Sequence, residues 1–247
     1  IIHLANIAND PTAELNQTLS WDVNVLATKK IMDLCVKAKI KKFIFASSGS
    51  VYGVSKAKKV TENLDLVPIS IYNKTKMISE RVILSYKDYF QVYCIRPATV
   101  CGYSPRMRLD LTVNMLTMQA LTNKKINVFG GNQIRPNVHI QDLVNAYIFF
   151  LNNSISSGIY NIGFENLSVM QIAKRIKKYI DCEIKISKSN DKRSYRLDSS
   201  KLLSTGFNPT FNINDAIEEL IYLSKNKILK NKDISYNIKW MMKKKFK

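Results

Sequence analysis

The sequence predicts an α/β fold built around a parallel β-sheet. Apolar runs of strand length alternate along the chain with segments whose apolar residues recur at helical spacing, a pattern typical of βα units. The chain has 247 residues, of which 46% are hydrophobic and 23% charged, so it is long enough to bury a substantial core. Only 8 glycines and 6 prolines occur, which excludes collagen-like and linker-dominated chains.

The first half of the chain predicts three strands, each a short apolar run, that alternate with three helices. In chain order they are strand 1–5, helix 20–38, strand 43–46, helix 72–86, strand 92–95 and helix 111–121. In the first of these helices Val23, Ile31 and Leu34 fall on one apolar side. The third strand ends at Arg96 and Pro97.

The second half of the chain has shorter apolar segments. In order they predict helix 141–151, strand 159–162, helix 169–180, strand 183–186 and helix 213–224. Ser168 is the expected N-cap of the second of these helices, because its hydroxyl can accept a hydrogen bond from a first-turn N–H. The chain then ends in a tail that we expect to be mobile and that is rich in lysine: Lys243, Lys244, Lys245 and Lys247.

The charge balance is strongly basic, with 38 Lys+Arg against 19 Asp+Glu, a net charge of +19 and a pI near 9.7. Such a charge favours anionic partners. The lysines are scattered, however, and no zinc spacing, basic helix or RNA-stacking motif accompanies them, so we expect a solvated surface and no nucleic-acid partner. The apolar stretches are far shorter than the about 18 residues of a membrane span. No membrane partner is expected either.

The four cysteines predict neither a disulfide framework nor a metal site. Cys35, Cys94, Cys101 and Cys182 are widely spaced, and none belongs to a CxxC pair. No base stands beside any of them, so a nucleophilic cysteine is not expected. This usage fits a reduced compartment, and we expect the protein to be cytoplasmic.

Tyr72 and Lys76 form a candidate catalytic pair. They stand four residues apart at the start of a predicted helix, so their side chains lie one turn apart on one face. A tyrosine normally has a pKa of about 10, and an adjacent cation lowers that pKa because it favours the phenolate. A second pair with this spacing, Tyr52 and Lys56, lies where a strand runs into a loop, so the helical context favours Tyr72.

The predicted strand 43–46 delivers small hydroxyl residues at its carboxyl end. The segment reads FIFASSGSVYG, with Ser47 and Ser48 directly after the apolar run. Carboxyl ends of parallel strands meet at one edge of a sheet, where ligands bind. The next predicted strand leads to Thr99, which is therefore expected at the same edge.

Seven features occur in a fixed order along nearly the whole chain: HLA after the first strand, an Asn in the next helix, ASSxxVYG, YxxxK, RPxxVxG, RPxxHxxD and YNIG. In this order they resemble the extended short-chain dehydrogenase/reductase family, in its NAD-dependent nucleotide-sugar epimerase/dehydratase branch. The resemblance implies a doubly wound, Rossmann-like parallel sheet with a smaller α/β substrate-binding domain. It assigns residues 1–103 and 137–165 to the NAD-binding domain, and residues 104–136 and 166–247 to the nucleotide-sugar-binding domain.

By this resemblance Tyr72 is the general acid/base that acts on a sugar hydroxyl. Lys76 lowers the pKa of Tyr72 and hydrogen-bonds the nicotinamide ribose, and Ser48 shares a hydrogen bond with the sugar hydroxyl. The implied cofactor is NAD, with NADP as an alternative. The resemblance places these residues around the cofactor: Leu4, Ala5, Asn24, Ser47, Tyr72, Lys76, Pro97 and Thr99.

The resemblance places a nucleotide-diphosphate sugar against the second domain. The residues expected to contact this substrate are Ser48, Thr99, Asn114, Phe129 and Arg135. Arg135 suits a diphosphate because a guanidinium donates two hydrogen bonds at once. His139 and Asp142 of the HxxD element are interpreted as mainly structural, with Asp142 near a helix start. Three further arginines either lie near a phosphate or carry ordinary surface charge: Arg106, Arg108 and Arg193.

Two features of the family's pattern differ in this sequence. The glycine-rich fingerprint GxxGxxG and the acidic residue that reads the adenine ribose do not occur. Because residue 1 corresponds to the family's fourth strand, we expect an N-terminally truncated Rossmann-like sheet with an exposed edge. Members that dehydrate the sugar carry an acidic pair where Gly49 and Ser50 stand here. The sequence therefore predicts epimerisation through a transient keto intermediate rather than dehydration.

Two other functions remain open. An NAD(P)H-dependent reductase of a keto nucleotide sugar would use the same residues and would consume reduced cofactor. A catalytically incompetent fragment or binding module would keep the fold and an anionic-ligand surface. The resemblance also implies a homodimer that pairs through the helices beginning near Ser20 and Tyr72.

Overall fold

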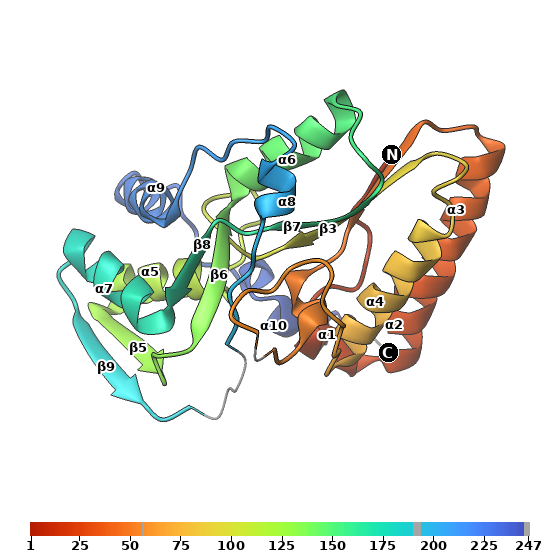
Figure 1. Ribbon diagram of the computed structural model, residues 1–247. Coiled ribbons are helices and arrows are strands. Elements are labelled where there is room, and N and C mark those ends of the chain that lie inside the picture. Colours follow the sequence, from red (N-terminus) through yellow and green to blue (C-terminus); the bar gives the residue numbers. More distant parts are fainter. Residues whose placement is uncertain (56, 190–193, 245–247) are drawn as a thin grey trace.

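The computed structural model describes residues 1–55, 57–189 and 194–244, and its main element is a four-stranded parallel sheet (Figure 1). Lys56 of the second tyrosine–lysine pair, Arg193, and Lys245 and Lys247 of the tail lie outside the described residues. The strands, in their order across the sheet, are β1 (Ile2–His3), β2 (Lys42–Ala46), β3 (Gln91–Pro97) and β7 (Gly158–Ile162). All three neighbouring pairs are parallel, so the predicted parallel α/β sheet is confirmed.

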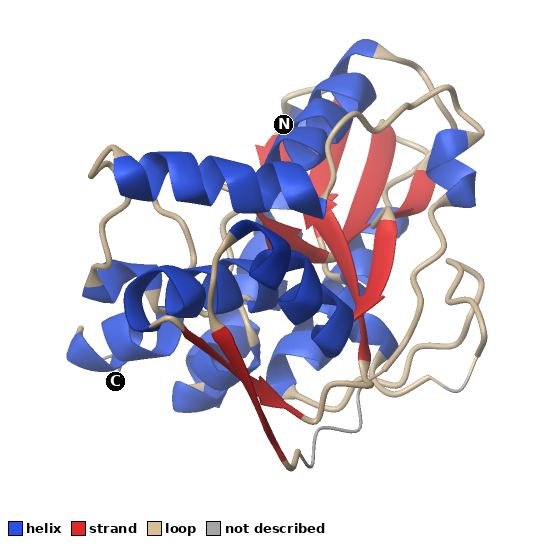
Figure 2. Cartoon of the chain, turned by 90° about the vertical axis from the view of Figure 1, so that its left-hand side faces the viewer, coloured by secondary structure: helices blue, strands red, loops and turns tan. Residues whose placement is uncertain are grey.

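Helices cover both faces of this sheet (Figure 2). They are α3 (Ala27–Lys37) and α4 (Ile71–Leu84) on one face and α6 (Ile140–Asn152) on the other. Because side chains alternate along a strand, Phe43 and Phe45 pack against α3 and α4. Ile44, between them, packs with Tyr93 and Phe150 on the α6 face. Strands buried on both sides explain why these segments are continuously apolar in the sequence.

The predicted helix 20–38 is confirmed as a continuous helical stretch over residues 17–37, with a π-helical turn inside it. Its parts are α2 (Gln17–Trp21), a π-helical turn (Asp22–Leu26) and α3, and a short helix α1 (Asp10–Leu15) precedes them. The π-helical turn carries Asn24, whose side chain is fully buried and bonds to the loop after β1. A π-helical turn widens the helix locally, and apolar periodicity does not record it.

A second unit lies beside the carboxyl edge of the main sheet and contains two small sheets (Figure 1). One sheet has β4 (Thr99–Cys101), β6 (Ile134–His139) and β8 (Glu165–Ser168); the other pairs β5 (Lys125–Phe129) with β9 (Glu183–Ser187). Its helices are α5 (Thr112–Asn123), α7 (Val169–Tyr179) and α9 (Ile213–Lys225). Ser168 caps α7 as predicted, in a capping box with Gln171. Strands β4, β5, β6 and β8 had no sequence prediction, because they are short or carry polar residues.

The expected domain limits stay a prediction, and two features bear on them. Strand β6 runs across the limit between residues 136 and 137 and pairs with both β4 and β8. Helix α8 (Ser200–Leu203), expected with the substrate-binding domain, places Leu202 in the same core as Ile44 of the main sheet. The two units therefore share a continuous interface.

The expected mobility of the lysine-rich tail stays a prediction, and secondary structure forms in the segment that leads into it. A 3₁₀ turn (Asp233–Ser235) and helix α10 (Asn237–Lys243) form there. Asp233 pairs with Lys239 at 2.6 Å and also contacts Lys243, so part of the lysine-rich tail is held by an acidic neighbour. In the part of the chain that the structure describes, no helix is long and apolar enough to cross a membrane.

Candidate active site

A pocket of about 520 Å³ opens at the carboxyl edge of the main sheet and continues to the second unit. Both units contribute to its walls, as expected for a ligand that contacts two domains. From the main-sheet unit its lining includes Asn9, Asp10, Ser47, Ser48, Tyr72, Pro97 and Thr99. From the second unit it includes Arg108, Asp110, Arg135, Tyr195 and Ile238.

Tyr72 lies in the first turn of α4, which begins after the N-cap Ser70. Its hydroxyl is hydrogen-bonded to the Ser48 side chain. Burial raises the pKa of Tyr72 to about 12; the Ser48 bond and the Arg108 guanidinium oppose this rise, and Asp10 adds to it. The expected lowering of the Tyr72 pKa by Lys76 is therefore not seen, because desolvation of the phenolate outweighs the effect of the Arg108 cation and Lys76 is not among the groups that shift this pKa.

Ser48 begins a chain of hydroxyl groups behind Tyr72. Its Oγ lies 2.8 Å from Ser50 Oγ, and Ser50 donates to Asn73 Oδ1 at 2.7 Å. Ser48 is also the N-cap of a 3₁₀ turn (Gly49–Tyr52) that follows β2. Local backbone structure thus holds the Ser48 side chain in the position in which it faces Tyr72.

Lys76 lies one turn further along α4 and is only 3% exposed. Its Nζ donates to Asn6 Oδ1 and to the Ala46 carbonyl, and it lies 5.7 Å from the centre of the Tyr72 ring. Burial lowers the pKa of Lys76 to about 7, against the opposing effect of Glu80. At neutral pH the cation and the free amine are thus of comparable abundance.

The residues predicted around the cofactor separate into three groups. Ser47, Pro97 and Thr99 line the pocket. Leu4 is 62% exposed just beyond β1, at the same edge as Ala5, and can border a bound ligand. Asn24 does not face the pocket: its amide bonds to the backbone of Ile7 at 2.8 and 3.1 Å and to Thr75 at 3.0 Å, so it positions the loop after β1.

The predicted substrate residues are only partly brought together. Arg135 lines the pocket with Thr99 and Ser48. Asn114 is buried, and its amide bonds to Gly102 and to the Arg108 carbonyl at 3.0 Å. Phe129 is 56% exposed at the end of β5 and, like Asn114, is not among the residues that line the pocket. Their contact with a substrate stays a prediction.

Of the three open arginines, two are placed by the structure. Arg108 lines the pocket and donates to Asp110 Oδ1 at 2.8 Å. Arg106 donates to Asn237 Oδ1 at 2.8 Å, so it fastens the C-terminal helix α10. Of these two arginines, Arg108 therefore lines the pocket and Arg106 does not.

His139 and Asp142 have the structural role that was predicted. His139 is the N-cap of α6 and stacks on Phe211 with ring centres 4.9 Å apart. Asp142 is fully buried and accepts hydrogen bonds from the backbone N–H groups of Thr210 and Phe211. The HxxD element thus fastens the segment that leads into α9.

Several residues of the site had no sequence signal. Glu80 stands four residues after Lys76 and pairs with Arg96, with Nη2 and Oε2 2.6 Å apart and both side chains 2% exposed. Asn6 and Asn9 lie on the loop after β1, and no periodic pattern marks them. A glutamate one turn after the lysine was the only available hint of Glu80.

The hydrogen-bonding groups of Asn9 and Lys76 fit a polar ligand such as NAD. The Asn9 side-chain amide nitrogen lines the pocket, is buried and has no hydrogen-bond partner among the described residues. A lysine ammonium can donate three hydrogen bonds. Among the described residues, two acceptors, Asn6 Oδ1 and the Ala46 carbonyl, bind the Lys76 ammonium. Both groups are therefore suited to a polar ligand such as a ribose. The glycine-rich turn that would hold the pyrophosphate is not among these 247 residues.

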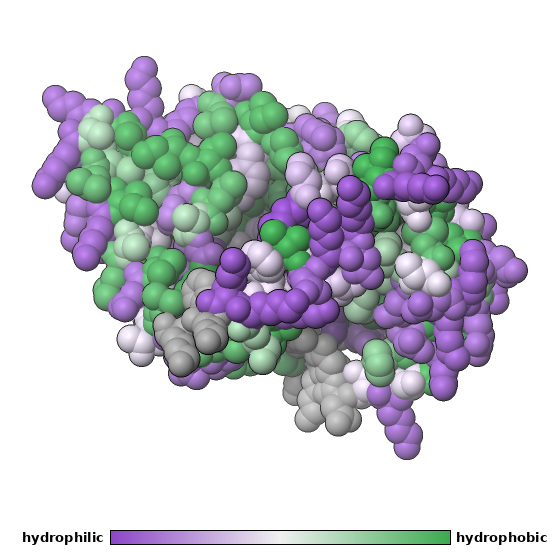
Figure 3. All heavy atoms as spheres, turned by 180° about the vertical axis from the view of Figure 1, so that it is seen from behind, coloured by the Kyte–Doolittle hydropathy of each residue, from purple (hydrophilic) through white to green (hydrophobic). Residues whose placement is uncertain are grey.

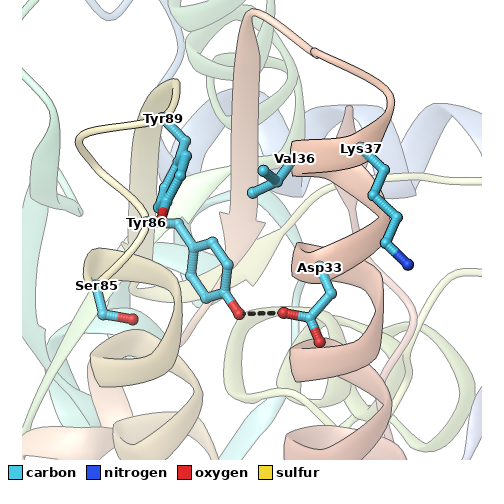
Figure 4. Close-up of a pocket in the computed structure, with 6 residues that line it drawn as sticks. All are labelled: Asp33, Val36, Lys37, Ser85, Tyr86 and Tyr89. Carbon is cyan, nitrogen blue, oxygen red and sulfur yellow. Dashed lines mark hydrogen bonds between the residues drawn. The ribbon is translucent and has the colours of Figure 1, made fainter.

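A second pocket, of about 530 Å³, lies away from this chemistry between α3 and the end of α4 (Figure 4). Its lining is Asp33, Val36, Lys37, Ser85, Tyr86 and Tyr89. Tyr86 donates to Asp33 Oδ1 at 2.6 Å across it, so these two groups are already paired with each other. It is a groove on the outer helical surface and brings no catalytic group together.

A parallel sheet whose carboxyl edge presents a tyrosine bonded to a serine, with a lysine one turn away, is the arrangement of short-chain dehydrogenases/reductases. Residues 1–163 match the family described as "NAD dependent epimerase/dehydratase family". The protein belongs to this NAD-dependent epimerase/dehydratase family, in its nucleotide-sugar branch.

Known relatives agree with this placement. A putative UDP-glucose 4-epimerase of Methanocaldococcus jannaschii is 31% identical over 237 residues, which cover 92% of this chain and 77% of that protein. The uncharacterized UDP-glucose epimerase YtcB of Bacillus subtilis is 34% identical over 157 residues, which cover 62% of this chain and about half, 49%, of that protein.

A solved structure with a similar fold is the UDP-glucuronic acid 4-epimerase from Bacillus cereus, in complex with UDP-glucuronic acid and NAD. It superposes with a TM-score of 0.78 at 27% identity, over 91% of this chain and 76% of that one.

Proposed function

We propose that this protein catalyses the NAD-dependent epimerisation of a nucleotide-diphosphate sugar through a transient keto intermediate. The observation that carries the proposal is the Tyr72–Ser48 hydrogen bond in the pocket at the sheet edge, with Lys76 one helical turn away. These three groups can bind a sugar hydroxyl and move its proton. The relatives named for UDP-sugar epimerisation support the same substrate class.

In the proposed reaction Tyr72 takes the proton of a sugar hydroxyl while the carbon that bears it is oxidised to a ketone. Bound NAD would supply the hydride acceptor and donor that this oxidation and its reversal require. Ser48 holds the oxygen throughout. When the hydride returns to the opposite face of the ketone, Tyr72 gives its proton back, so the product is an epimer and no cofactor is consumed.

The charge around Tyr72 suits both directions of this transfer. With its pKa raised to about 12 by burial, Tyr72 is a phenol in the free protein, the form that donates. Taking a proton requires a cation to stabilise the phenolate, and the Lys76 ammonium and the Arg108 guanidinium are the nearby groups that supply it. The protonation state of Lys76 therefore matters for the reaction.

The described geometry favours epimerisation over dehydration. A Cβ on Gly49 would lie 3.1 Å from the Pro97 carbonyl oxygen, so a longer acidic side chain has no room there without movement. Among the described residues the carboxylates that line the pocket already have partners: Asp10 accepts from Ser70 at 2.5 Å, and Asp110 accepts from Arg108. Neither is poised as the extra acid that loss of water requires.

Arg135 and Arg108 are proposed to face the diphosphate of the nucleotide sugar. Both line the pocket that Tyr72 and Ser48 also line. Guanidinium groups bind phosphate oxygens in pairs, and a partly buried site screens this attraction little. The sugar would then lie between the arginines and Tyr72.

We also propose that two copies of the chain pair through α3 and α4. Apolar side chains gather on the side of the molecule where α2, α3 and α4 lie, seen on the left of Figure 3. On this side Leu26, Leu34 and Tyr89 are 55%, 61% and 66% exposed. Such exposure beside a groove is typical of a surface that a partner covers.

The proposed reaction is tested by incubating the intact chain and NAD with UDP-glucose or UDP-glucuronic acid and following the sugar by proton NMR. Parallel calorimetric titrations with NAD and NADP identify the cofactor. We expect formation of an epimer at constant absorbance of reduced cofactor. Tyr72→Phe should lower the rate about 10²- to 10⁴-fold, because the proton-transfer group is lost.

Tyr86→Phe is the matched control, because it removes a tyrosine hydroxyl that lies in the outer groove. Its rate should equal that of the wild type. Steady consumption of added reduced cofactor would instead identify a reductase. Binding of the cofactor and of the UDP-sugar without chemical change in either would identify a binding module and refute the proposed reaction.

A further inference from the structure

A buried ion pair lies directly behind the catalytic residues. The Arg96 guanidinium donates to Glu80 Oε1 at 2.8 Å and to Oε2 at 2.6 Å, and both residues are at most 2% exposed. Arg96 also donates to the Tyr52 hydroxyl at 2.8 Å, and Tyr52 in turn donates to Asn161. Removing two charges from water is costly, so this pair contributes little net stability, and its placement invites a functional explanation.

Helix α4 holds the end of β2 at two consecutive residues. Lys76 Nζ donates to the carbonyl of Ala46, and Glu80 Oε1 accepts from the Ser47 hydroxyl at 2.5 Å. The next residue is Ser48, which bonds to Tyr72. Lys76 and Glu80 are four residues apart and therefore neighbours on one helical face. Glu80 thus contacts the strand end that presents the serine and stands beside the lysine.

We propose that Glu80, held in place by Arg96, is a positioning residue for the reaction: it fixes Ser47 and hence Ser48, and its carboxylate keeps the Lys76 ammonium charged beside Tyr72. This inference rests on the proposed function, because it assigns a purpose to the charge on Lys76. The ion pair is then a part of the active site that does not itself touch the substrate.

The groups that face Lys76 support this assignment. From its own helix these are Glu80 and Tyr72; from β1 it is His3, and from β3 it is Cys94. Burial lowers the pKa of Lys76, and Glu80 is the first of the groups that raise it. Burial lowers the pKa of His3, and the charge of Lys76 lowers it further.

The sign of the effect follows from the charges. Without the Glu80 carboxylate the ammonium of Lys76 loses its negative neighbour while its burial stays the same, so its pKa falls further below 7. A neutral amine cannot stabilise the Tyr72 phenolate. The turnover rate should then drop, while substrate affinity, which depends on the arginines that line the pocket, should change little.

The test is a titration of the intact chain labelled with ¹³C at the lysine Cε positions, followed by NMR from pH 5 to 10. Lys76→Arg identifies the Lys76 signal, which should titrate near 7 in the wild type. In the double variant Glu80→Gln/Arg96→Met, which leaves no unpaired buried charge, the midpoint should fall, though by less than in Glu80→Gln alone, because loss of the Arg96 cation offsets part of the effect. A fall of one pH unit is a tenfold fall in the ratio of charged to neutral Lys76. Glu80→Gln alone should shift it in the same direction.

Tyr52→Phe is the matched control, because it removes a hydrogen bond from the same network and leaves the Glu80 carboxylate in place. It should lower stability without moving the Lys76 midpoint. An unchanged midpoint in the Glu80 variants, or a wild-type midpoint above 9, overturns the proposal. The titration needs no turnover, so it gives its answer even if no sugar is epimerised.

Where a substrate is turned over, kcat gives a second readout. The Glu80 variants should lower kcat at least tenfold at pH 8 with KM within twofold of the wild type. Equal loss of kcat in Tyr52→Phe would show that the network acts through stability alone and would refute the assignment.

Discussion

Burial of the charged Lys76 side chain costs free energy, which other interactions in the folded protein have to offset. An unfolded lysine has a pKa near 10.5 and buried Lys76 one of about 7, so between these values the unfolded chain binds more protons than the folded chain. The free energy of unfolding therefore rises with pH across this window. The destabilising effect of the buried charge is largest at pH 7 and below and disappears as the pH approaches 10.5.

Replacing this lysine should reveal that dependence. Lys76→Met removes the buried charge. The free energy of unfolding of the variant minus that of the wild type should therefore be larger, by about 2–4 kcal/mol, at pH 6 than at pH 10. Urea unfolding at the two pH values measures it. Lys30→Met, at an exposed position on α3, is the control and should show little change at either pH. An equal effect of Lys76→Met at both values would mean that folding does not lower the pKa of Lys76.

The site residues that the sequence could predict are those whose positions follow from local structure. Tyr72 and Lys76 share one helix, and Ser48 follows a strand whose carboxyl end had to face them. Glu80 and Asn6 were missed because their roles depend on how α4 lies over the end of β2 and the loop after β1. The raised pKa of Tyr72 was missed for the same reason, since burial is set by packing across the pocket.

A few buried polar groups connect one helix or strand to the next part of the fold, and the start of α6 is the clearest example. Asp142 at its start accepts two hydrogen bonds from the Thr210 N–H, at 3.0 and 3.2 Å, and one from the Phe211 N–H at 2.9 Å. The segment before α9 is thus attached to the helix that covers the main sheet. Sequence alone indicated a structural role here but not the partner, which is about 70 residues away.

Asp142→Asn should loosen this attachment. One acceptor oxygen is replaced by an NH₂ group that faces backbone donors, so stability should fall by about 1–3 kcal/mol. Chemical denaturation measures the loss, and kcat at a temperature where both proteins are folded should stay unchanged. Asp181→Asn, at an exposed position before β9, should have no measurable effect. Loss of activity without loss of stability would show that Asp142 acts in the reaction itself.

Helix ends were predictable where a capping residue marks them. The prediction 169–180 compares with Val169–Tyr179 in the structure, and 213–224 with Ile213–Lys225. Strand β6 was not predictable, because the segment Ile134–His139 contains a proline and polar residues and is a strand only through its pairing with β4 and β8. Tertiary pairing decides such short elements.

At the scale of the whole molecule, the net charge of +19 and the exposed apolar residues have different consequences. Positive charge raises the local concentration of anionic substrates around the pocket, an effect that salt screens. It also opposes association of two copies. Pairing through α3 and α4 therefore has to come from apolar burial, with Leu26, Leu34 and Tyr89 as the exposed side chains that it would cover.

A charge placed on this surface should separate the two copies. Leu34→Glu exposes a carboxylate where the proposed interface buries a leucine, so light scattering after size-exclusion chromatography should show the dimeric mass of the wild type fall to the monomeric value. Ile186→Glu is the matched control, because Ile186 on β9 is also 61% exposed but lies in the second unit. A monomeric wild type, or equal dissociation by both variants, would place the contact elsewhere. Because α4 also carries Tyr72 and Lys76, loss of the dimer should lower the turnover rate of Leu34→Glu as well, in proportion to the monomer fraction.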